Sequence, residues 1–265
     1  MSRPSAHVVA SGGADRTILI WSIETNTVLH RFKQHKDAIT CLQFRLHEQS
    51  LYVYSGSLDR SIKVWDVEQG AYVETLFGHQ DSVIALDALS RERCVSAGGR
   101  DGTVRLWKIP EESQLVYRCG SHGIPAQSVD SVAMLDDDHF VYGTQSGLIG
   151  LLDVKRKKPV WTQATAHGVD EFGSARWITA MSAIPFSDIF CTGSWDGWVR
   201  LWRMADDANT CEEIAKIPVQ GVVNALHLSE SRLVIALGQE HRLGRWIRLE
   251  KVKNQVVVVT LNNTP

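Results

Sequence analysis

Short runs in which apolar and polar residues alternate follow one another along the chain, each roughly four to eight residues long, as half-buried β-strands are. Clusters of Gly, Asp and Ser separate the runs and predict turns. The runs recur in a fixed order: an apolar-rich run, a run that ends in small residues, a run that contains Trp, and an outer run. Examples of the first kind are residues 39–44, 83–89 and 178–184, of the second 52–56, 94–98 and 189–193, and of the fourth 72–77 and 115–118. The pattern predicts antiparallel units of four strands each.

The Trp-containing run carries a repeated motif in which Asp precedes Trp by six residues. Four copies align without gaps, and two degenerate copies complete the series, with Leu152-Asp153 in place of Trp-Asp in one and Arg245-Trp246 closing the other. The six units end near Trp21, Trp65, Trp107, Leu152, Trp202 and Trp246, at spacings of 42–50 residues. Such spacings with Trp-Asp endings are typical of β-propeller blades. We therefore predict an all-β WD-repeat propeller that forms a single domain over residues 1–265, with six repeats of which the first is incomplete.

The first unit begins at its second strand, near residues 7–11, whereas each of the other five has all four runs. This gives about 23 strands, with the inner strand of the first unit missing. The few residues before position 7 are too short to supply a strand and its turn. We expect a chain that lacks N-terminal sequence, or a ring that does not close, and that is less stable than a version with its N-terminal blade restored.

The structural tetrad of WD repeats, a hydrogen-bonded chain between strands, is recognisable in the sequence. The second unit supplies all four members, His35, Ser55, Asp59 and Trp65. A buried Asp needs such partners. In the third unit the alignment places Ala97 at the Ser position, and the fourth unit has Ser146 in place of Asp and no Trp. We expect the fourth blade to be held mainly by packing.

Composition restricts the class of protein. The 265 residues are 44% hydrophobic, which provides a sizeable core, and the net charge of −2 neither predicts nor excludes nucleic-acid binding. Five widely spaced cysteines without a Cys-x-x-Cys pair argue against a disulfide framework or a metal site and favour a reducing compartment. No run approaches the ~18 apolar residues of a membrane helix. We expect a soluble intracellular protein without a membrane partner.

Ten histidines raise the question of catalysis. His35 and His79 fall at the turn ahead of the inner strand, where the repeat requires them for structure. The Ser, His and Asp of the tetrad recur around the ring, whereas a nucleophile needs one unique base beside a pocket. Nucleophile-elbow, zinc-protease and phosphate-loop motifs are absent from the sequence. We therefore expect no enzyme, no catalytic residues, no cofactor and no small-molecule substrate.

The strongest basic concentration lies in residues 239–254, which carry a local net charge of +3. Alignment on the Trp places Arg245 at a normally apolar position between blades, that of Val64. Burial of an unpaired guanidinium is costly. We expect Arg245 either to pair with Glu240 or Glu250, or to reach the rim toward an anion.

Two further basic groups lie in turns. Arg16, Arg60 and Arg100 stand beside the turn Asp in three successive units, either as a ring along one rim or as solvated turn residues. Residues 155–158, Lys-Arg-Lys-Lys, predict an exposed turn that serves either as an import signal or phosphate contact, or as a solubilising loop.

Several segments go beyond the generic repeat. Residues 72–81, 85–91, 98–105, 107–115 and 238–246 closely resemble the WD-repeat family of the U3 small nucleolar ribonucleoprotein, and the resemblance extends over essentially the whole chain. It implies a nucleolar component that binds the box B/C region of U3 snoRNA together with a small kink-turn-binding RNP protein. Other small-subunit processome proteins are the further partners implied, in 18S pre-rRNA processing. The full-length family has seven blades and a charged N-terminal extension.

The resemblance also implies an RNA-facing role for residues of this chain. We place it on His241, Arg242, Arg245 and Arg248, with Arg100 and Arg105 as secondary candidates. A propeller rim would recognise a folded RNA through phosphate contacts and shape more than through base readout.

Two other functions remain open. A substrate receptor for a ubiquitin ligase typically carries Arg two residues beyond Trp-Asp, but Glu68 stands at that position after Trp65-Asp66. A peptide-binding propeller would read a short motif across its channel, and an aromatic cage open at the channel mouth would favour it.

Overall fold

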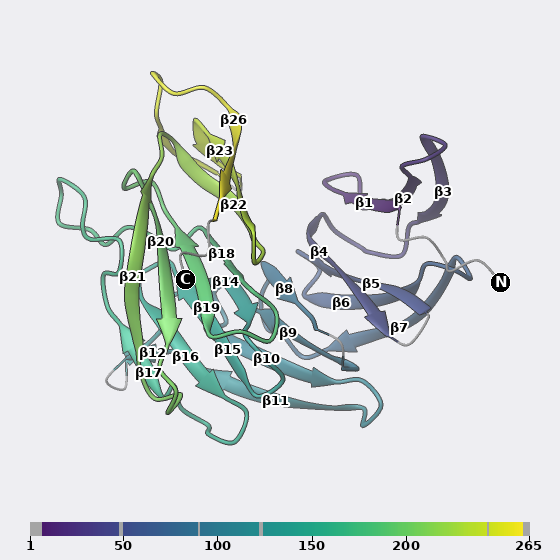
Figure 1. Ribbon diagram of the computed structural model, residues 1–265. Coiled ribbons are helices and arrows are strands. Elements are labelled where there is room, and N and C mark those ends of the chain that lie inside the picture. Colours follow the sequence, from purple (N-terminus) through teal and green to yellow (C-terminus); the bar gives the residue numbers. More distant parts are fainter. Residues whose placement is uncertain (1–6, 48–49, 90, 122–123, 243, 262–265) are drawn as a thin grey trace.

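Six antiparallel sheets follow one another in chain order around an arc, with their first strands toward the centre (Figure 1). This computed structural model describes residues 7–47, 50–89, 91–121, 124–242 and 244–261. The elements in those ranges are strands and turns without an α-helix. The prediction of an all-β WD-repeat propeller with six repeats and an incomplete first repeat is confirmed, but the expectation that the other five repeats each have four strands is wrong for the last, whose sheet has three strands in the described residues.

The first three blades occupy the N-terminal half. Blade 1 has three strands, β1 (Val8–Gly12), β2 (Ile18–Ser22) and β3 (Thr27–Phe32). Blade 2 comprises β4 (Ile39–His47), β5 (Ser50–Ser57), β6 (Ser61–Asp66) and β7 (Ala71–Phe77). Blade 3 comprises β8 (Ala85–Asp87), β9 (Arg93–Ala97), β10 (Thr103–Lys108) and β11 (Ser113–Arg118), and a short hairpin of β12 (Gly120–Ser121) and β13 (Ile124–Pro125) follows it.

The other three blades complete the arc. Blade 4 comprises β14 (Val129–Met134), β15 (His139–Thr144), β16 (Ile149–Asp153) and β17 (Trp161–Gln163). Blade 5 comprises β18 (Ala180–Ala183), β19 (Ile189–Gly193), β20 (Trp198–Met204) and β21 (Cys211–Pro218). Blade 6 comprises β22 (Val222–Leu228), β23 (Arg232–Gly238) and β26 (Gln255–Thr260), with a hairpin of β24 (Glu240–His241) and β25 (Gly244–Arg248) inserted before β26.

The hydrophobic core lies between neighbouring blades, because each sheet covers the apolar face of the next. Between blades 1 and 2, Phe32 stacks on Trp65 with ring centroids 4.6 Å apart, and Ile20 and Val53 belong to the same cluster. Equivalent clusters join the later pairs of blades. Blade order is therefore maintained by side-chain packing, whereas strand pairing operates inside each blade.

The second blade contains a complete chain of buried hydrogen bonds. Trp65 Nε1 donates to Ser55 Oγ over 2.8 Å, Ser55 Oγ lies 2.7 Å from His35 Nε2, and His35 Nδ1 lies 2.8 Å from Asp59. One set of directions satisfies every group, with Ser55 donating to Nε2 and Nδ1–H donating to Asp59. Burial would raise the pKa of Asp59, but hydrogen bonds from Ser61, from the Lys36 N–H and from His35 hold it at about 2.

The third blade also has a complete tetrad, and the alignment that placed Ala97 at its Ser position was wrong. Ser96 Oγ accepts from Trp107 Nε1 at 2.8 Å and lies 2.6 Å from His79 Nε2. The turn between Ser96 and Asp101 is one residue longer than the turn between the corresponding residues of blade 2, which shifts an alignment based on Asp. Ala97 instead belongs to the apolar core between blades.

The remaining blades show how far the tetrad can vary. Blade 5 replaces Ser by Thr192, whose Oγ1 lies 2.9 Å both from His167 Nε2 and from Trp202 Nε1. Blade 4 lacks the Asp and the Trp of the tetrad, and it buries Phe140 and Tyr142 completely in a cluster shared with blade 3. This agrees with the expectation that packing holds the fourth blade.

The third strand of the last blade is not the predicted one. β26 pairs with β23 along its whole length, from Arg232 opposite Thr260 to Leu237 opposite Gln255. Arg245-Trp246 instead lies in β25, which pairs with β24. The four consecutive valines of β26 suit a half-buried strand far better than a segment with Arg at its apolar position, and Val257 and Val259 pack on the core. The assignment of Arg245 to an inter-blade position is therefore wrong.

One carboxylate joins the inner strands of three blades. Asp87 accepts hydrogen bonds from Gln43 Nε2 of β4 at 2.9 Å and from the backbone N–H groups of Met134 and Ala88, each at 2.8 Å. Burial among these strands raises the pKa of Asp87 to about 6, although both backbone hydrogen bonds favour the charged form. The carboxyl group therefore titrates near neutral pH.

All five cysteines are free in the structure. Within the described ranges, no helix is long and apolar enough to cross a membrane.

Replacing Ser55 by Ala should lower the free energy of unfolding by about 2–4 kcal/mol, because Trp65 Nε1 and His35 Nε2 lose their shared buried partner. Urea denaturation measures the change. Ser131→Ala is the control, since Ser131 is also buried but makes only a 3.4 Å hydrogen bond to Ile178 O. Equal effects of the two substitutions would show that the tetrad adds nothing beyond the burial of a hydroxyl.

Asp87 should give the protein a pH-dependent stability. Because its folded pKa of about 6 lies above the ordinary 3.8, its stabilising contribution is complete below about 4 and is lost as pH rises through 6. The stability of Asp87→Asn relative to the unmodified protein should therefore improve between about pH 4 and 6 and level off at higher pH in urea denaturation. Asp207→Asn, at an exposed carboxylate whose pKa is lowered by hydrogen bonds from Asn209, should show no such trend. A flat difference for Asp87→Asn would contradict the assignment.

Candidate nucleic-acid interface

The basic segment 239–254 forms an extra loop between β23 and β26, built around the β24–β25 hairpin. Three hydrogen bonds close its base: Leu249 N to Gln239 O at 2.9 Å, Gln239 N to Asn254 Oδ1 at 3.0 Å, and Gln239 Nε2 to Val252 O at 2.6 Å. The strands on either side remain paired in blade 6. The loop is therefore an ordered insertion in a continuous sheet.

Arg242 ties this hairpin to the opposite side of the propeller. Its Nη1 donates to the carbonyl of Thr40 in β4 at 2.9 Å, and its Nη2 donates to the carbonyl of Ile84 at 3.2 Å. Its backbone N–H donates to Asn224 Oδ1 in β22 at 2.9 Å. Blades 2, 3 and 6 thus meet at one guanidinium group, which holds the hairpin across the channel mouth.

His241 faces the interior of the channel mouth. Its ring packs edge-to-face with Trp177 at a centroid distance of 5.9 Å, and Trp177 makes a similar contact with Trp195 at 5.7 Å. Burial lowers the pKa of His241 to about 4, and the charge of Arg242 acts in the same direction. His241 is therefore neutral at physiological pH and adds no positive charge.

Three further cations of the loop are exposed to solvent. Arg248, Lys251 and Lys253 are exposed, and Arg248 Nε lies 3.5 Å from Glu240 Oε1. The backbone of Arg245 lies in β25 beside them, but its side chain is outside the described part of the structure. Its pairing with Glu240 or Glu250 therefore stays a prediction.

The two secondary candidates lie apart from each other. Arg100 is exposed at the channel mouth, where its backbone N–H donates to Asp81 Oδ2 at 3.1 Å. Arg105 is buried in β10 and donates to Gln114 Oε1 at 2.7 Å, and burial lowers its pKa although the charge of Asp101 opposes this. Arg100 thus shares a surface with the hairpin, whereas the guanidinium of Arg105 is directed toward the outer strand of its own blade.

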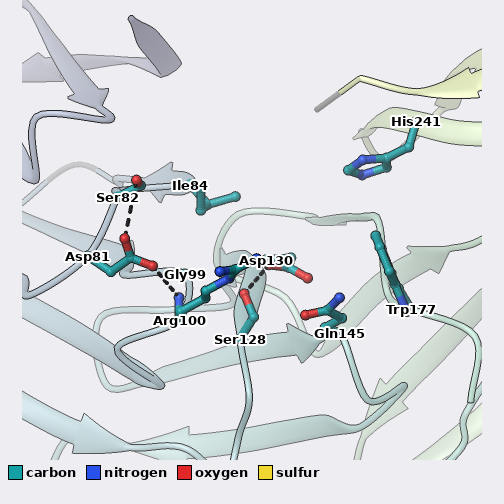
Figure 2. A pocket seen from close by; sticks show the side chains of 10 residues that line it. All are labelled: Asp81, Ser82, Ile84, Gly99, Arg100, Ser128, Asp130, Gln145, Trp177 and His241. Atoms are coloured by element: carbon teal, nitrogen blue, oxygen red, sulfur yellow. Dashed lines mark hydrogen bonds between the residues drawn. The ribbon is translucent and has the colours of Figure 1, made fainter. Parts of the chain in front are cut away.

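A pocket of about 320 Å³ occupies the channel mouth beside the hairpin, between turns of several blades (Figure 2). Its polar lining includes Asp81, Arg100, Asp130 and Gln145, and its aromatic lining is Trp177 and His241. Except for Arg100 and His241, none of these residues could be selected from the sequence. Asp81, Gln145 and Trp177 lie outside the strands and Asp130 lies near the start of β14, so residues of several blades come together only in the assembled propeller.

The Lys-Arg-Lys-Lys turn at residues 155–158 lies at the other end of blade 4. It follows β16, whereas Gln145 of the pocket precedes that strand. The turn is exposed, and Lys155 Nζ lies 3.7 Å from Asp138 Oδ2. This second basic surface is therefore separated from the hairpin by the length of a strand.

Metal chemistry finds no support here, since no group of three or more His, Cys, Asp or Glu side chains is placed to hold an ion in the described ranges.

The fold and its tetrads define a WD-repeat propeller with an insertion at its channel mouth. The family model described as "WD domain, G-beta repeat" matches residues 2–22, 26–66, 70–108 and 165–203. The match covers more than half of the chain, and the chain belongs to the WD40-repeat family.

Individual relatives show which WD40-repeat proteins this chain resembles. U3 small nucleolar RNA-interacting protein 2 of Homo sapiens is 45% identical over 262 residues, which cover 97% of this chain and 54% of that protein. Ribosomal RNA-processing protein 9 of Saccharomyces cerevisiae is 30% identical over 328 residues, which cover 98% of this chain and 57% of that protein. The chain spans about half the length of these relatives. The resemblance to the U3 ribonucleoprotein WD-repeat family is confirmed.

Solved structures show the same similarity. The structure described as "Crystal structure of RRP9 WD40 repeats" has a TM-score of 0.89 and 42% identity, over 97% of this chain and 77% of that chain. "Structure of U3-55K" has a TM-score of 0.88 at the same identity, over 96% of this chain and 77% of that chain.

Arg242→Ala should loosen the hairpin without unfolding the blades, because it removes both contacts to the Thr40 and Ile84 carbonyls. Hydrogen exchange of the β24 and β25 amides should accelerate ~10-fold, as expected for the loss of charged-donor hydrogen bonds. Exchange in β23 should not change. Arg248→Ala, which removes a charge from the same hairpin but no contact across the channel, serves as control. Unchanged exchange in Arg242→Ala would contradict the anchoring role.

Proposed function

We propose that the chain is a non-catalytic scaffold of the U3 small nucleolar ribonucleoprotein, which binds U3 snoRNA and protein partners during 18S pre-rRNA processing and small-subunit biogenesis. The relatives are described as a U3 small nucleolar RNA-interacting protein and a ribosomal RNA-processing protein, which supports this assignment. The box B/C region of U3 snoRNA, a small kink-turn-binding protein and other processome proteins are the partners we propose. The proposed location is the nucleolus.

The observation that carries the proposal is the anchored basic loop. Arg248, Lys251 and Lys253 extend into solvent from a hairpin that Arg242 fixes to two other blades. A rigid array of cations binds RNA phosphates with less loss of conformational entropy than a flexible tail. Exposed Arg100 continues the same surface across the channel mouth.

A scaffold role also agrees with the environment of the Ser, His and Asp side chains. Where blade 2 brings them together, they are buried and bonded to Trp65, and no open site adjoins Ser55. Such groups stabilise the sheet and are not accessible to a substrate. This supports the proposal that the protein is not an enzyme.

Neutralising the loop should weaken RNA binding. The triple variant Arg248→Gln, Lys251→Gln and Lys253→Gln should bind a box B/C transcript of U3 snoRNA ~10-fold more weakly at fixed salt, with a salt slope reduced by up to about 2. Fluorescence anisotropy over a salt series measures both quantities. Thermal unfolding should stay the same, because all three side chains are exposed.

The matched control removes three charges from the opposite end of blade 4, through Lys155→Gln, Lys157→Gln and Lys158→Gln. It should bind the transcript as the unmodified protein does. Equal weakening by both variants would reduce the effect to net charge and remove the loop from the proposal. Co-purification with a ubiquitin-ligase adaptor, without RNA in the same eluate, would favour the adaptor function instead.

A further inference from the structure

The pocket at the channel mouth has the size of a site for one small group. Its volume of about 320 Å³ lies at the lower end of the range for ligand pockets, roughly 300–1,000 Å³. It adjoins the hairpin through His241, one of its lining residues. A group held there would therefore lie next to the proposed RNA-binding loop.

The charges around the pocket disfavour both an anionic and a cationic ligand. Asp81 and Asp130 would repel a phosphate, while Arg100 would repel a Lys or Arg side chain (Figure 2). Burial raises the pKa of Asp130, with the hydroxyl of Ser128 and the charges of Arg242 and Arg100 acting against this. The lining therefore favours a neutral ligand that offers both donors and acceptors.

Two polar groups are held in fixed positions. Asp81 accepts from the backbone of Arg100 and so fixes the turn from which the guanidinium extends toward Asp130 (Figure 2). Ser128 Oγ donates to Asp130 Oδ1, which fixes the orientation of the carboxylate. A carboxylate, a guanidinium and the amide of Gln145 thus line the same pocket, and the charge of Arg100 acts on Asp130.

The opposite wall is aromatic. Trp177 stands upright at the edge of the pocket with a ring face turned toward Gln145 and Asp130, and His241 lies above it (Figure 2). The edge-to-face contacts with Trp195 and His241, at interplanar angles of 82°, restrain the Trp177 ring. A flat aromatic ligand would find a preformed stacking surface there.

We propose that this pocket receives a single unstacked guanine base of a bound RNA, stacked on Trp177 and read by Asp130 and Arg100. The inference rests on the proposed RNA-binding function and extends it to base recognition. Guanine presents two neighbouring donors, N1–H and the N2 amino group, that suit a carboxylate, and two neighbouring acceptors, O6 and N7, that suit a guanidinium. Adenine would instead direct its N6 amino group at Arg100 and its N1 lone pair at Asp130.

Short single-stranded oligonucleotides test the base preference. Five-residue RNAs with one central guanosine, adenosine or inosine in uridine should be titrated into the whole chain by isothermal calorimetry at fixed salt. The guanosine RNA should bind at least ~10-fold more tightly than the adenosine RNA, with inosine between them because it lacks the N2 amino group. Asp130→Asn and Arg100→Ala should each abolish most of this preference.

Arg100 is exposed, so its variant keeps the test valid if Asp130→Asn fails to fold. Asp37→Asn is the control: Asp37 lies two residues after His35 in blade 2, as Asp81 lies two residues after His79 in blade 3, but it is exposed and does not line the pocket. Trp177→Ala should weaken binding of all three RNAs, whereas Trp177→Phe should retain most of it.

Equal affinity for the guanosine and adenosine RNAs would overturn the inference. Binding of an Arg- or Lys-containing peptide that depends on Asp130, without base preference, would also overturn it and assign the pocket to a protein partner. The triple variant of Arg248, Lys251 and Lys253 distinguishes a failure of the guanine site from a failure of the proposed RNA-binding function. If that variant loses U3 RNA while the pocket variants do not change base preference, the scaffold function stands and the guanine site does not.

Discussion

The buried hydrogen-bonded chain from Trp to Asp is the constraint on which the other features depend. In blade 3 it joins the third strand at Trp107 to the second at Ser96, and through His79 to the turn that enters the inner strand. Because His79 and Asp101 are held in this chain, Asp81, two residues after His79, and Arg100, one residue before Asp101, are also held in place at the channel mouth. The part of the site formed by Asp81 and Arg100 therefore takes its geometry from buried polar groups.

The sequence predicts the propeller well because the signals for a blade are local. Repeat spacing and strand alternation give the fold class, and the second unit shows its tetrad by position alone. Two predictions, the tetrad Ser of blade 3 and the third strand of the last unit, were wrong for the same reason: each relied on alignment to a single residue. In blade 3 the turn between the tetrad Ser and Asp is one residue longer, so an alignment based on Asp placed the Ser position at 97 instead of 96. In the last unit, alignment on Trp246 selected the wrong third strand, although the β-branched run of β26 suits a strand better.

The site is less accessible to prediction. Charge counting finds the basic loop, but it treats all its cations alike, whereas the structure separates Arg242, which binds backbone carbonyls, from exposed Lys251 and Lys253. Asp130 and Trp177 carry no motif, since the first is an ordinary residue of β14 and the second an ordinary loop residue within its own repeat. Only the spatial arrangement of the blades makes them neighbours.

Arg242 and Thr40 are 202 residues apart in the sequence, so their contact can form only after the residues between them have been synthesised. At ~5–20 residues per second, Arg242 is made roughly 10–40 s after Thr40. During that interval the first blades can pair and pack, but the channel mouth has no hairpin. A nascent chain thus acquires the sheets of its first blades before it acquires the hairpin, so the proposed RNA-binding surface is complete only after blade 6 has been synthesised.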